Sequence, residues 1–477
     1  MGVSRLVRLT PQYRLALMLV FFSLGLPACV VGDFIGAYFN TYYNAQALFT
    51  QAEEEIWTQT DTRLSGHNLL LTLSIPASSR TKLTSVVEKC SKLLQDHPDS
   101  HFVDDALLMI GKAFFYQGDF TRADRKFKEL LETYPQSGLI METRVWMAYA
   151  EYKQSNLDNA EATAKVLLDD AQKAGEHENA GYAAMLLGRI RADRLDYANS
   201  CTFYELAGSE AGNSDLKATA LLTAGDMYLS NADSVHAYAM YIKASNVTSN
   251  YLNKYKAYLG QATSLSRLGR GNDATNLLTE LRRNTNYKEY WGEIDVETGD
   301  AYKRMKKYSE AVDQYDYVDT AYARSEWGTL ADLHLGLLWE KVFGDFDSAR
   351  AAYMRARPTG TPSVAASLLA DRLSLMNRYV SCRNAIVLND SLITAVSSPQ
   401  DSTVHGRSDT LAVDTTREAS RDTTRRSTDT AASVPQRSGK SIPLDTLNSR
   451  LAFAMNELAT LFFTGLALPD SAVAYSP

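Results

Sequence analysis

The sequence predicts an all-α fold, a superhelical solenoid of about eight helical hairpins with a 37-residue period. The first observation behind this prediction is a series of small residues at positions 111, 148, 188, 225, 262, 299 and 336, spaced by 37 residues except for one interval of 40. The second is that apolar and aromatic residues follow each small residue at helical spacing. The third is composition, because 27 tyrosines and only 12 prolines in 477 residues favour helices over a loop-rich β fold.

The clearest repeat covers residues 104–137. Its signature positions are Leu107, Ile110, Gly111, Phe114, Ala123, Phe127, Leu130 and Pro135. Gly111 and Ala123 are small where two helices would cross closely, and Gly118 suits a left-handed helix end before the capping residue Asp119. This pattern resembles the tetratricopeptide repeat in each signature slot, and the resemblance implies stacked hairpins with a concave face lined by the first helices.

The period also predicts how the chain is divided. We expect a seven-repeat solenoid over residues 101–358, with one extra residue in the turn of the last repeat. Residues 29–100 are predicted as N-terminal helices that form one repeat split by a polar insertion. Residues 359–395 are predicted as C-terminal helices, and residues 444–477 as a partial hairpin with an apolar face to cover. Residues 396–443 lack aromatic side chains and mix aspartate with arginine, which predicts a disordered low-complexity linker.

Residues 1–28 have the pattern of a signal peptide. Arginines precede an apolar run over residues 15–26, which is shorter than the ~20 residues that a membrane-spanning helix needs. The boundary at residues 26–29 reads Leu-Pro-Ala-Cys and resembles a bacterial lipobox, except that Pro27 stands where a small or β-branched residue is usual. The resemblance implies lipidation of Cys29 and a membrane anchor without a spanning helix. The alternative is an ordinary signal or uncleaved anchor, in which Cys29 is incidental.

Charge and motifs argue against several classes of function. The formal charge of −7 without a basic stripe argues against nucleic-acid binding, and four cysteines are too few for a disulfide scaffold. Pro98 separates His97 from His101, so the two histidines are not expected to share a helix face as metal ligands. The SxxK motif at residues 79–82 lacks its KTG companion, and no HExxH, GxSxG, CxxC or Walker motif occurs. We therefore predict no catalysis, metal, cofactor or small-molecule substrate.

The remaining functional candidate is the concave face, which we expect to contact other proteins. Tyrosine and arginine are typical contact residues because they combine area with hydrogen bonds. The predicted partner-binding residues are Leu108, Lys112, Phe115, Tyr116, Tyr149, Tyr152, Tyr182 and Arg189, with Val145 and Met185 beside them. The charged residues expected further along the groove are Asp226, Asp300, Lys303, Arg304, Glu340 and Lys341.

A lipobox followed by these repeats resembles the BamD-like lipoproteins of the outer-membrane barrel-assembly machinery. The resemblance is closest over residues 96–137, where Pro-x-Ser ends one repeat and a helix opens the next at both Pro98 and Pro135. It implies a lipid-anchored adaptor of the bacterial envelope that faces the periplasm and binds other envelope proteins. The valines after Cys29, in place of aspartate, favour the outer membrane. The alternatives are a lipoprotein of a secretion or gliding-motility machine and a factor associated with cell-wall glycan.

Overall fold

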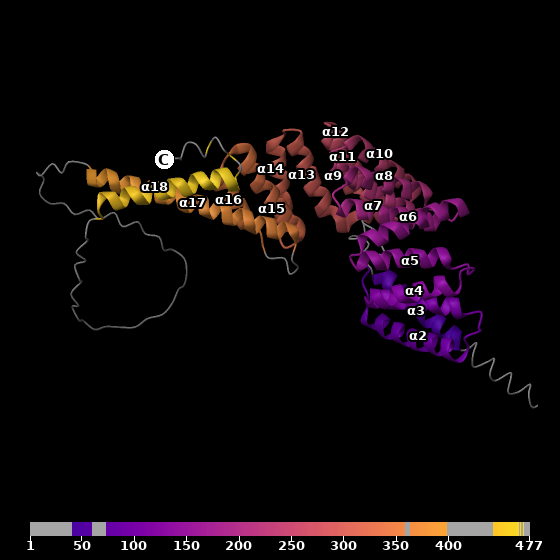
Figure 1. Ribbon diagram of the computed structural model, residues 1–477. Helices are drawn as coiled ribbons and strands as arrows, with labels where there is room; N and C mark the ends of the chain where they lie inside the picture. The colour runs from indigo at the N-terminus through magenta and orange to yellow at the C-terminus, as the bar shows by residue number, and fades with distance from the viewer. Residues whose placement is uncertain are drawn as a thin grey trace, which may run out of the picture. The chain divides into compact units, whose positions relative to one another are not determined.

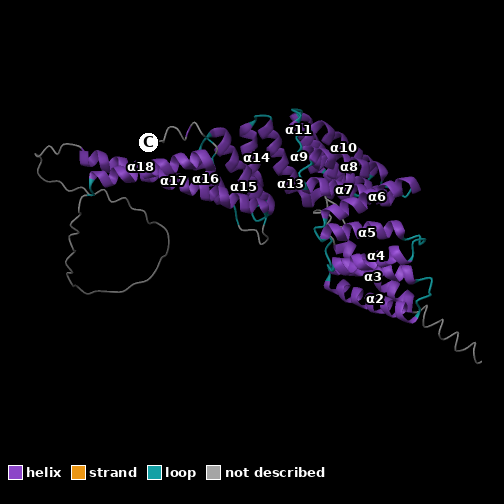
Figure 2. Ribbon diagram, viewed as in Figure 1, coloured by secondary structure: helices purple, strands orange, loops and turns teal. Residues whose placement is uncertain are grey.

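The structure is a computed structural model that describes residues 41–59, 73–357, 363–397, 442–466, 468 and 471. All regular elements within these residues are helices (Figures 1 and 2). The prediction of an all-α solenoid of helical hairpins is therefore confirmed. The predicted signal peptide, Cys29 and most of the predicted linker lie outside the described residues.

The chain divides into two compact units, residues 1–314 and 315–477. The division falls inside the range predicted for the seven-repeat solenoid, within α14 (Tyr308–Ala321). In the first unit, helices pack against their neighbours in the chain as successive hairpins. These helices are residues 41–59 with α2 (Ala77–Asp96), α3 (Val103–Gln117) with α4 (Phe120–Thr133), α5 (Ile140–Lys153) with α6 (Leu157–Ala174), α7 (His177–Asp193) with α8 (Tyr197–Glu210), α9 (Ser214–Ser230) with α10 (Ser234–Val247), α11 (Tyr251–Arg267) with α12 (Gly271–Arg283), and α13 (Trp291–Arg304) after the 3-10 helix η2 (Thr285–Tyr290).

A left-handed residue follows each first helix from α3 onward. Its φ lies between +59° and +83°, and it recurs every 37 residues except for intervals of 40 and 38. The seven positions are Gly118, Ser155, Leu195, Ala232, Gly269, Lys306 and Gly344. The predictions for Gly118 and Asp119 are confirmed, since the Asp119 carboxylate accepts a hydrogen bond from the Arg122 N–H at 3.0 Å. At four positions, however, the left-handed turn is made by a residue other than glycine.

Glycines in the first helices lie against aromatic rings of the second helices. A Cβ at Gly111 would lie 2.3 Å from the Phe127 ring, so no larger residue fits without a shift. The same contact joins Gly188 to Tyr204, Gly225 to Tyr241 and Gly336 to Tyr353. Where the first helix has alanine instead, the residue at the ring position is Ala164 or Leu278. Gly111 therefore lies against the ring of Phe127, which is one turn after Ala123.

The second unit contains the last predicted repeat and the helices that follow it. Its elements are α15 (Glu326–Leu338), the π-helix η3 (Trp339–Phe343), α16 (Phe346–Arg355), α17 (Val364–Ser397), α18 (Leu444–Thr460) and the π-helix η4 (Leu461–Gly465). The Gly344 N–H donates to the carbonyl of Trp339, so the extra residue of this repeat lies in a π turn at the helix end. The helix of the predicted partial hairpin, α18, packs along α17.

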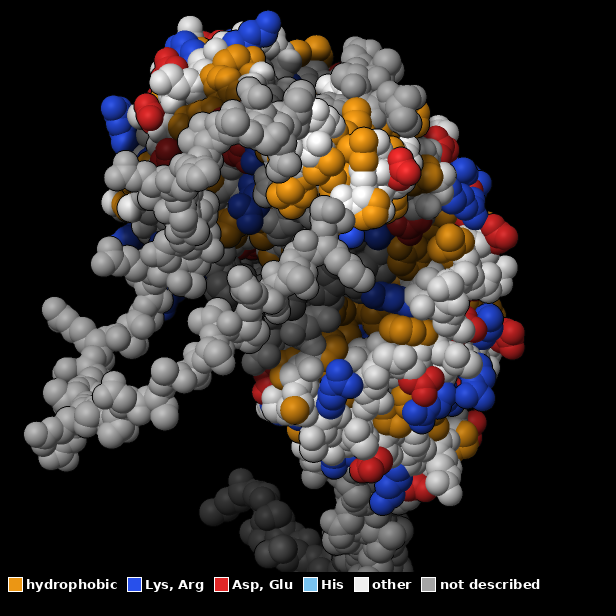
Figure 3. Space-filling view, turned by 90° about the vertical axis from the view of Figure 1, so that its left-hand side faces the viewer, with side chains coloured by type: hydrophobic (Ala, Val, Ile, Leu, Met, Phe, Trp, Pro, Cys, Tyr) orange, Lys and Arg blue, Asp and Glu red, His pale blue; other side chains and the backbone are white. Residues whose placement is uncertain are grey.

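The surface of the second unit has exposed apolar side chains. Phe453 is 68% exposed and Phe463 is 66% exposed. Hydrophobic side chains gather in patches between charged ones on the face drawn in Figure 3. Basic and acidic side chains are mixed on that face rather than separated, as expected for a chain with a small net charge.

Candidate functional site

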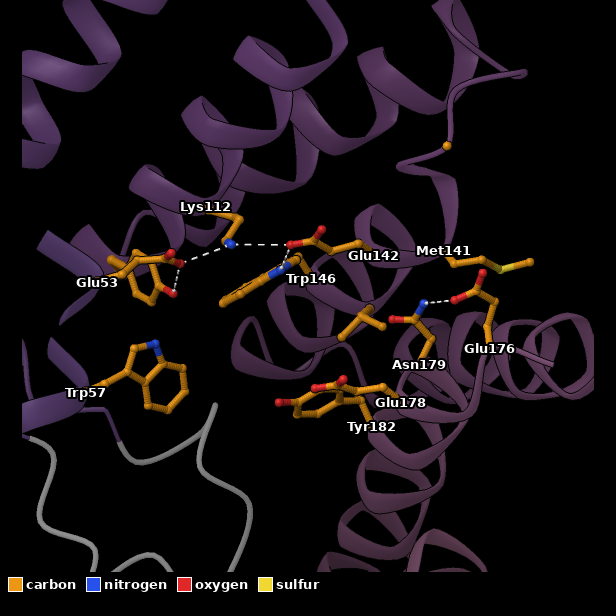
Figure 4. A pocket seen from close by; sticks show the side chains of 13 residues that line it. Glu53, Trp57, Lys112, Met141, Glu142, Trp146, Glu176, Glu178, Asn179 and Tyr182 are labelled. Carbon is orange, nitrogen blue, oxygen red and sulfur yellow. Dashed lines mark hydrogen bonds and ion pairs between the residues drawn. The ribbon is translucent and has the colours of Figure 1, made fainter. Parts of the chain in front are cut away.

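A hollow of about 530 Å³ lies in the first unit, among the first helices of four successive hairpins. These are the helix of residues 41–59, α3, α5 and α7 (Figure 4). We call this hollow the groove pocket. Its lining residues are Glu53, Trp57, Lys112, Tyr116, Gly138, Met141, Glu142, Val145, Trp146, Glu176, Glu178, Asn179 and Tyr182.

Lys112 of α3 lies at one side of the groove pocket and is held by neighbours from two other helices. Its Nζ is 3.0 Å from Glu53 Oε1 and 3.3 Å from Glu142 Oε1. The same ammonium lies 4.9 Å from the ring centroid of Trp146 and 5.1 Å from that of Phe49. Carboxylates and aromatic faces both stabilise a cation. The pocket wall therefore already holds one amine by both kinds of contact.

The two glutamates beside Lys112 also accept hydrogen bonds from the aromatic wall. Tyr116 Oη donates to Glu53 Oε1 at 2.7 Å, and Trp146 Nε1 donates to Glu142 Oε1 at 3.3 Å. The two rings lie edge to face, with centroids 5.5 Å apart. Burial, and then the charge of Glu53, raises the pKa of Tyr116 well above its usual value, so this hydroxyl remains a donor at neutral pH. Ring packing and hydrogen bonds together fix this wall.

The opposite side of the pocket comes from the start of α7 and carries carboxylates that are not neutralised. Glu176 and Glu178 are exposed, and within the described part of the chain neither pairs with a basic side chain. In Figure 4, Glu178 lies beside the Tyr182 ring, and Trp57 borders the same hollow. Burial, followed by the charges of Glu178 and Glu142, raises the pKa of Tyr182 to about 12. The pocket therefore combines aromatic faces with an excess of negative charge.

The structure separates the predicted partner-binding residues into three groups. Lys112, Tyr116 and Tyr182 line the groove pocket. Leu108, Phe115 and Tyr149 are buried in the core, and Tyr149 Oη donates to the carbonyl of Tyr182 at 3.1 Å. The other two, Tyr152 and Arg189, are partly exposed and bonded to each other, with 3.1 Å between Arg189 Nε and Tyr152 Oη. Of the two further candidates, Val145 lines the pocket and Met185 is buried.

Sequence reasoning missed all four glutamates and both tryptophans of the pocket. A usable signal was present, because glutamate precedes tryptophan by four residues in two first helices, at Glu53 with Trp57 and at Glu142 with Trp146. Residues four apart share a helix face, so each pair presents a carboxylate and an indole to the same side. None of the other three tryptophans has an acidic residue at that position.

The charged residues expected further along the groove bond to the protein itself. Tyr241 Oη donates to Asp226 at 2.6 Å, and Lys303 Nζ lies 2.8 Å from Asp300. Arg304 pairs with Glu297 at 2.9 Å. In the second unit, Lys341 donates to the carbonyl of Leu466 at 2.8 Å, and Glu340 is 2% exposed and bonded on both oxygens. These groups are bonded within α13 or between neighbouring parts of the protein, which leaves little of their charge for a ligand.

The described residues offer neither a metal site nor a membrane span. No group of three or more histidine, cysteine, aspartate or glutamate side chains there is placed to hold a metal ion. None of the helices in those ranges combines the length and hydropathy needed to cross a bilayer.

Comparison with known proteins identifies one repeat. The family profile of the tetratricopeptide repeat matches residues 105–137, which are α3, α4 and their flanks. None of the curated proteins matches the sequence significantly. Residues 105–137 thus match a tetratricopeptide repeat, a helical hairpin of the kind that is suited to binding other proteins.

Comparison with solved structures finds matches at low sequence identity and low TM-score. A tetratricopeptide repeat protein from Parabacteroides merdae is 15% identical, with a TM-score of 0.41, and the match covers 57% of this chain and 98% of that one. The quorum sensor NprR from B. thuringiensis is 12% identical, with a TM-score of 0.42 and coverage of 71% and 99%. The C-terminal part of a repeat protein from Cytophaga hutchinsonii is 12% identical, with a TM-score of 0.36 and coverage of 60% and 94%.

Proposed function

We propose that this protein is a lipid-anchored adaptor of the bacterial envelope, which holds other envelope proteins at the periplasmic side of the outer membrane. The observation that carries the adaptor role is the groove pocket, because a hollow among four first helices is a surface on which another protein can dock. The anchor rests on the sequence Leu-Pro-Ala-Cys after the apolar run, with Cys29 as the lipidated residue. The absence of catalytic motifs fits an adaptor better than an enzyme.

The finer part of the proposal is a role like that of the BamD-like lipoproteins in envelope assembly. Its support is the likeness over residues 96–137, which includes the one repeat that the family profile matches. That repeat supplies Lys112 and Tyr116 to the groove pocket, so the most recognisable repeat is also part of the candidate site.

The anchor is tested by replacing Cys29 with alanine and fractionating cells. We expect the unchanged protein to be labelled by a palmitate analogue and to sediment with outer membranes. The C29A protein should lose the label and leave the membrane fraction. Equal labelling and sedimentation of the two proteins would contradict the anchor.

The adaptor role is tested by crosslinking cells, solubilising the membranes in detergent and purifying the tagged protein with its partners. Recovery of a core subunit of the barrel-assembly machinery is the expected result. Recovery of secretion or gliding-motility components without that subunit would favour the first alternative instead. Saturable retention on isolated sacculi, without a protein partner, would favour the glycan-associated alternative.

A further inference from the structure

We infer that the groove pocket binds a lysine or arginine side chain presented by an extended segment of a partner protein. This inference rests on the proposed adaptor function and specifies the chemistry of the partner. It is carried by three properties of one hollow, which are its volume, its aromatic wall and the sign of its charge.

The negative charge of the groove pocket favours the binding of a cation. Its lining contains four glutamates and one lysine, and Lys112 lies between only two of the four, Glu53 and Glu142. Glu176 and Glu178, on the opposite side, have no basic partner among the described residues. An acidic segment entering here would face like charges, which disfavour it strongly. A basic side chain would instead supply the missing positive charge.

The aromatic wall selects the same kind of group. Trp57, Trp146 and Tyr182 border the hollow in Figure 4, and cations bind favourably over aromatic faces. Lys112 shows this mode within the protein, because its ammonium lies 4.9 Å from the Trp146 centroid while it contacts two carboxylates. The part of the pocket away from Lys112 has the same kinds of group, namely carboxylates and aromatic rings. These belong to Glu176, Glu178, Tyr182 and Trp57.

The size of the pocket fits a side chain together with part of its backbone. A volume of about 530 Å³ is in the range of hollows that enclose a small ligand. The pocket is lined by four helices of successive hairpins, so it extends across several repeats rather than lying inside one. An extended segment can therefore lie across the first helices with its basic side chain inside.

The test uses the purified full-length protein in detergent and three synthetic peptides of equal length. One has two arginines in a Gly-Ser background, one has citrulline in place of each arginine, and one has glutamate. Citrulline keeps the shape of arginine but removes its charge. Isothermal calorimetry should show binding of the arginine peptide, about tenfold weaker binding of the citrulline peptide and none of the glutamate peptide. Equal affinity for arginine and citrulline would overturn the inference.

A matched pair of double variants locates the binding. The double variant Glu176→Gln, Glu178→Gln should bind the arginine peptide about tenfold more weakly, since both carboxylates line the pocket. Glu129→Gln with Glu132→Gln makes the same charge change on the exposed surface of α4 and should leave affinity unchanged. If both pairs weaken binding equally, the peptide responds to overall charge and the inference fails. Trp57→Leu should also weaken binding, whereas Trp57→Phe should retain it.

These measurements can fail independently of the proposed function. The peptide assay needs neither lipid nor a cellular partner, so the C29A protein should bind the arginine peptide like the unchanged protein. Peptide binding without any envelope partner would refute the adaptor role and keep the inference. Recovery of envelope partners with the unchanged protein, while that protein does not bind the arginine peptide, would do the reverse.

Discussion

The first helices of the early and the late repeats share one period but differ in how far their acidic side chains are paired within the protein. In the early hairpins, Lys112 borders a hollow where Glu176 and Glu178 remain without basic partners. At the same position of the period, the late helices have Asp226 and Asp300. Those carboxylates are bonded by Tyr241 and Lys303 of the protein itself.

This contrast separates two uses of one repeat position. The period fixes which residues face the groove, while residue type and neighbours decide whether that face meets a ligand or another helix. We therefore expect changes to early polar residues to affect binding with little effect on folding. Changes to late polar residues should affect folding, since an unpaired buried group destabilises a fold strongly.

The largest expected effect is at Glu340. One oxygen of this buried carboxylate accepts from Tyr353 Oη at 2.9 Å, and the other lies 3.3 Å from Arg372. Glu340→Ala should lower the free energy of unfolding of the second unit by about 3 kcal/mol or more, because two polar partners lose their acceptor. Urea unfolding followed by tryptophan fluorescence measures this. Glu178→Ala is the early control and should stay within about 0.5 kcal/mol of the unchanged protein. Equal losses of unfolding free energy in the two variants would contradict the contrast between early and late polar residues.

A pH effect of similar size is expected at Asp332, which is 1% exposed in the second unit. Burial, and then the charge of Asp319, raises the pKa of Asp332 to about 7, although Arg355 Nε lies 3.3 Å from its carboxylate. The folded state therefore holds this proton more tightly than the unfolded chain, whose aspartate pKa is about 3.9. Stability from this group is greatest at low pH and is lost as pH rises from about 4 to about 7.

Asp332→Asn removes that dependence. The stability difference between the variant and the unchanged protein should shift by about 3 kcal/mol in favour of the variant between pH 5 and pH 8. Urea unfolding at the two pH values gives this shift directly. A difference that does not change with pH would show that Asp332 titrates normally.

A smaller effect should distinguish two glycine contacts. A Cβ at Gly336 would lie 2.2 Å from the Tyr353 ring, whereas one at Gly188 would lie 3.0 Å from the Tyr204 ring. The Tyr353 ring is also tied to Glu340 by its hydroxyl. Gly336→Ala should cost about 2 kcal/mol and Gly188→Ala about 1 kcal/mol or less. Combining Gly336→Ala with Tyr353→Leu should recover part of the loss. Thermal unfolding measures both losses of stability. A greater loss for Gly188→Ala than for Gly336→Ala would contradict the prediction.

The smallest expected effect is a gain in stability at Leu195. This residue is 72% exposed and has φ +61°, a left-handed conformation that glycine adopts without strain. Leu195→Gly should raise stability by about 0.5–1 kcal/mol, and Gly118→Ala should lower it by about 1 kcal/mol. Calorimetric unfolding of the two variants measures both changes. A loss at Leu195 would mean that its side chain contributes more than its backbone strain costs.

Local pattern predicted the hairpins because small and aromatic residues recur in register with the helices. The same reasoning found Gly118 but not the left-handed turns at Ser155, Leu195, Ala232 and Lys306. Those residue types do not favour positive φ, so only their position in the period reveals the turn. Packing of the hairpins imposes that conformation on them.

The candidate site was only partly predictable for a related reason. Lys112, Tyr116 and Tyr182 follow from their places on the first helices. Glu53 and Trp57 belong to a helix whose repeat is interrupted, so the period gives no register for them. Tyr149 occupies a groove position in the period and yet is fully buried. Which neighbouring helix covers a residue is a property of the assembled stack, and no single repeat contains it.

The pairing of glycine with an aromatic ring has a consequence for how such chains change over generations. Gly111 and Phe127, like Gly188 and Tyr204, lie within one hairpin and about half a period apart. Duplicating or deleting a whole 37-residue hairpin keeps both members of the pair together, whereas a crossover inside a hairpin can join glycine to a residue that leaves a void. Tyr241 is the exception, because it also lies against Gly260 of the next hairpin. Recombination between α10 and α11 should therefore be tolerated less well than at junctions where each pair is self-contained.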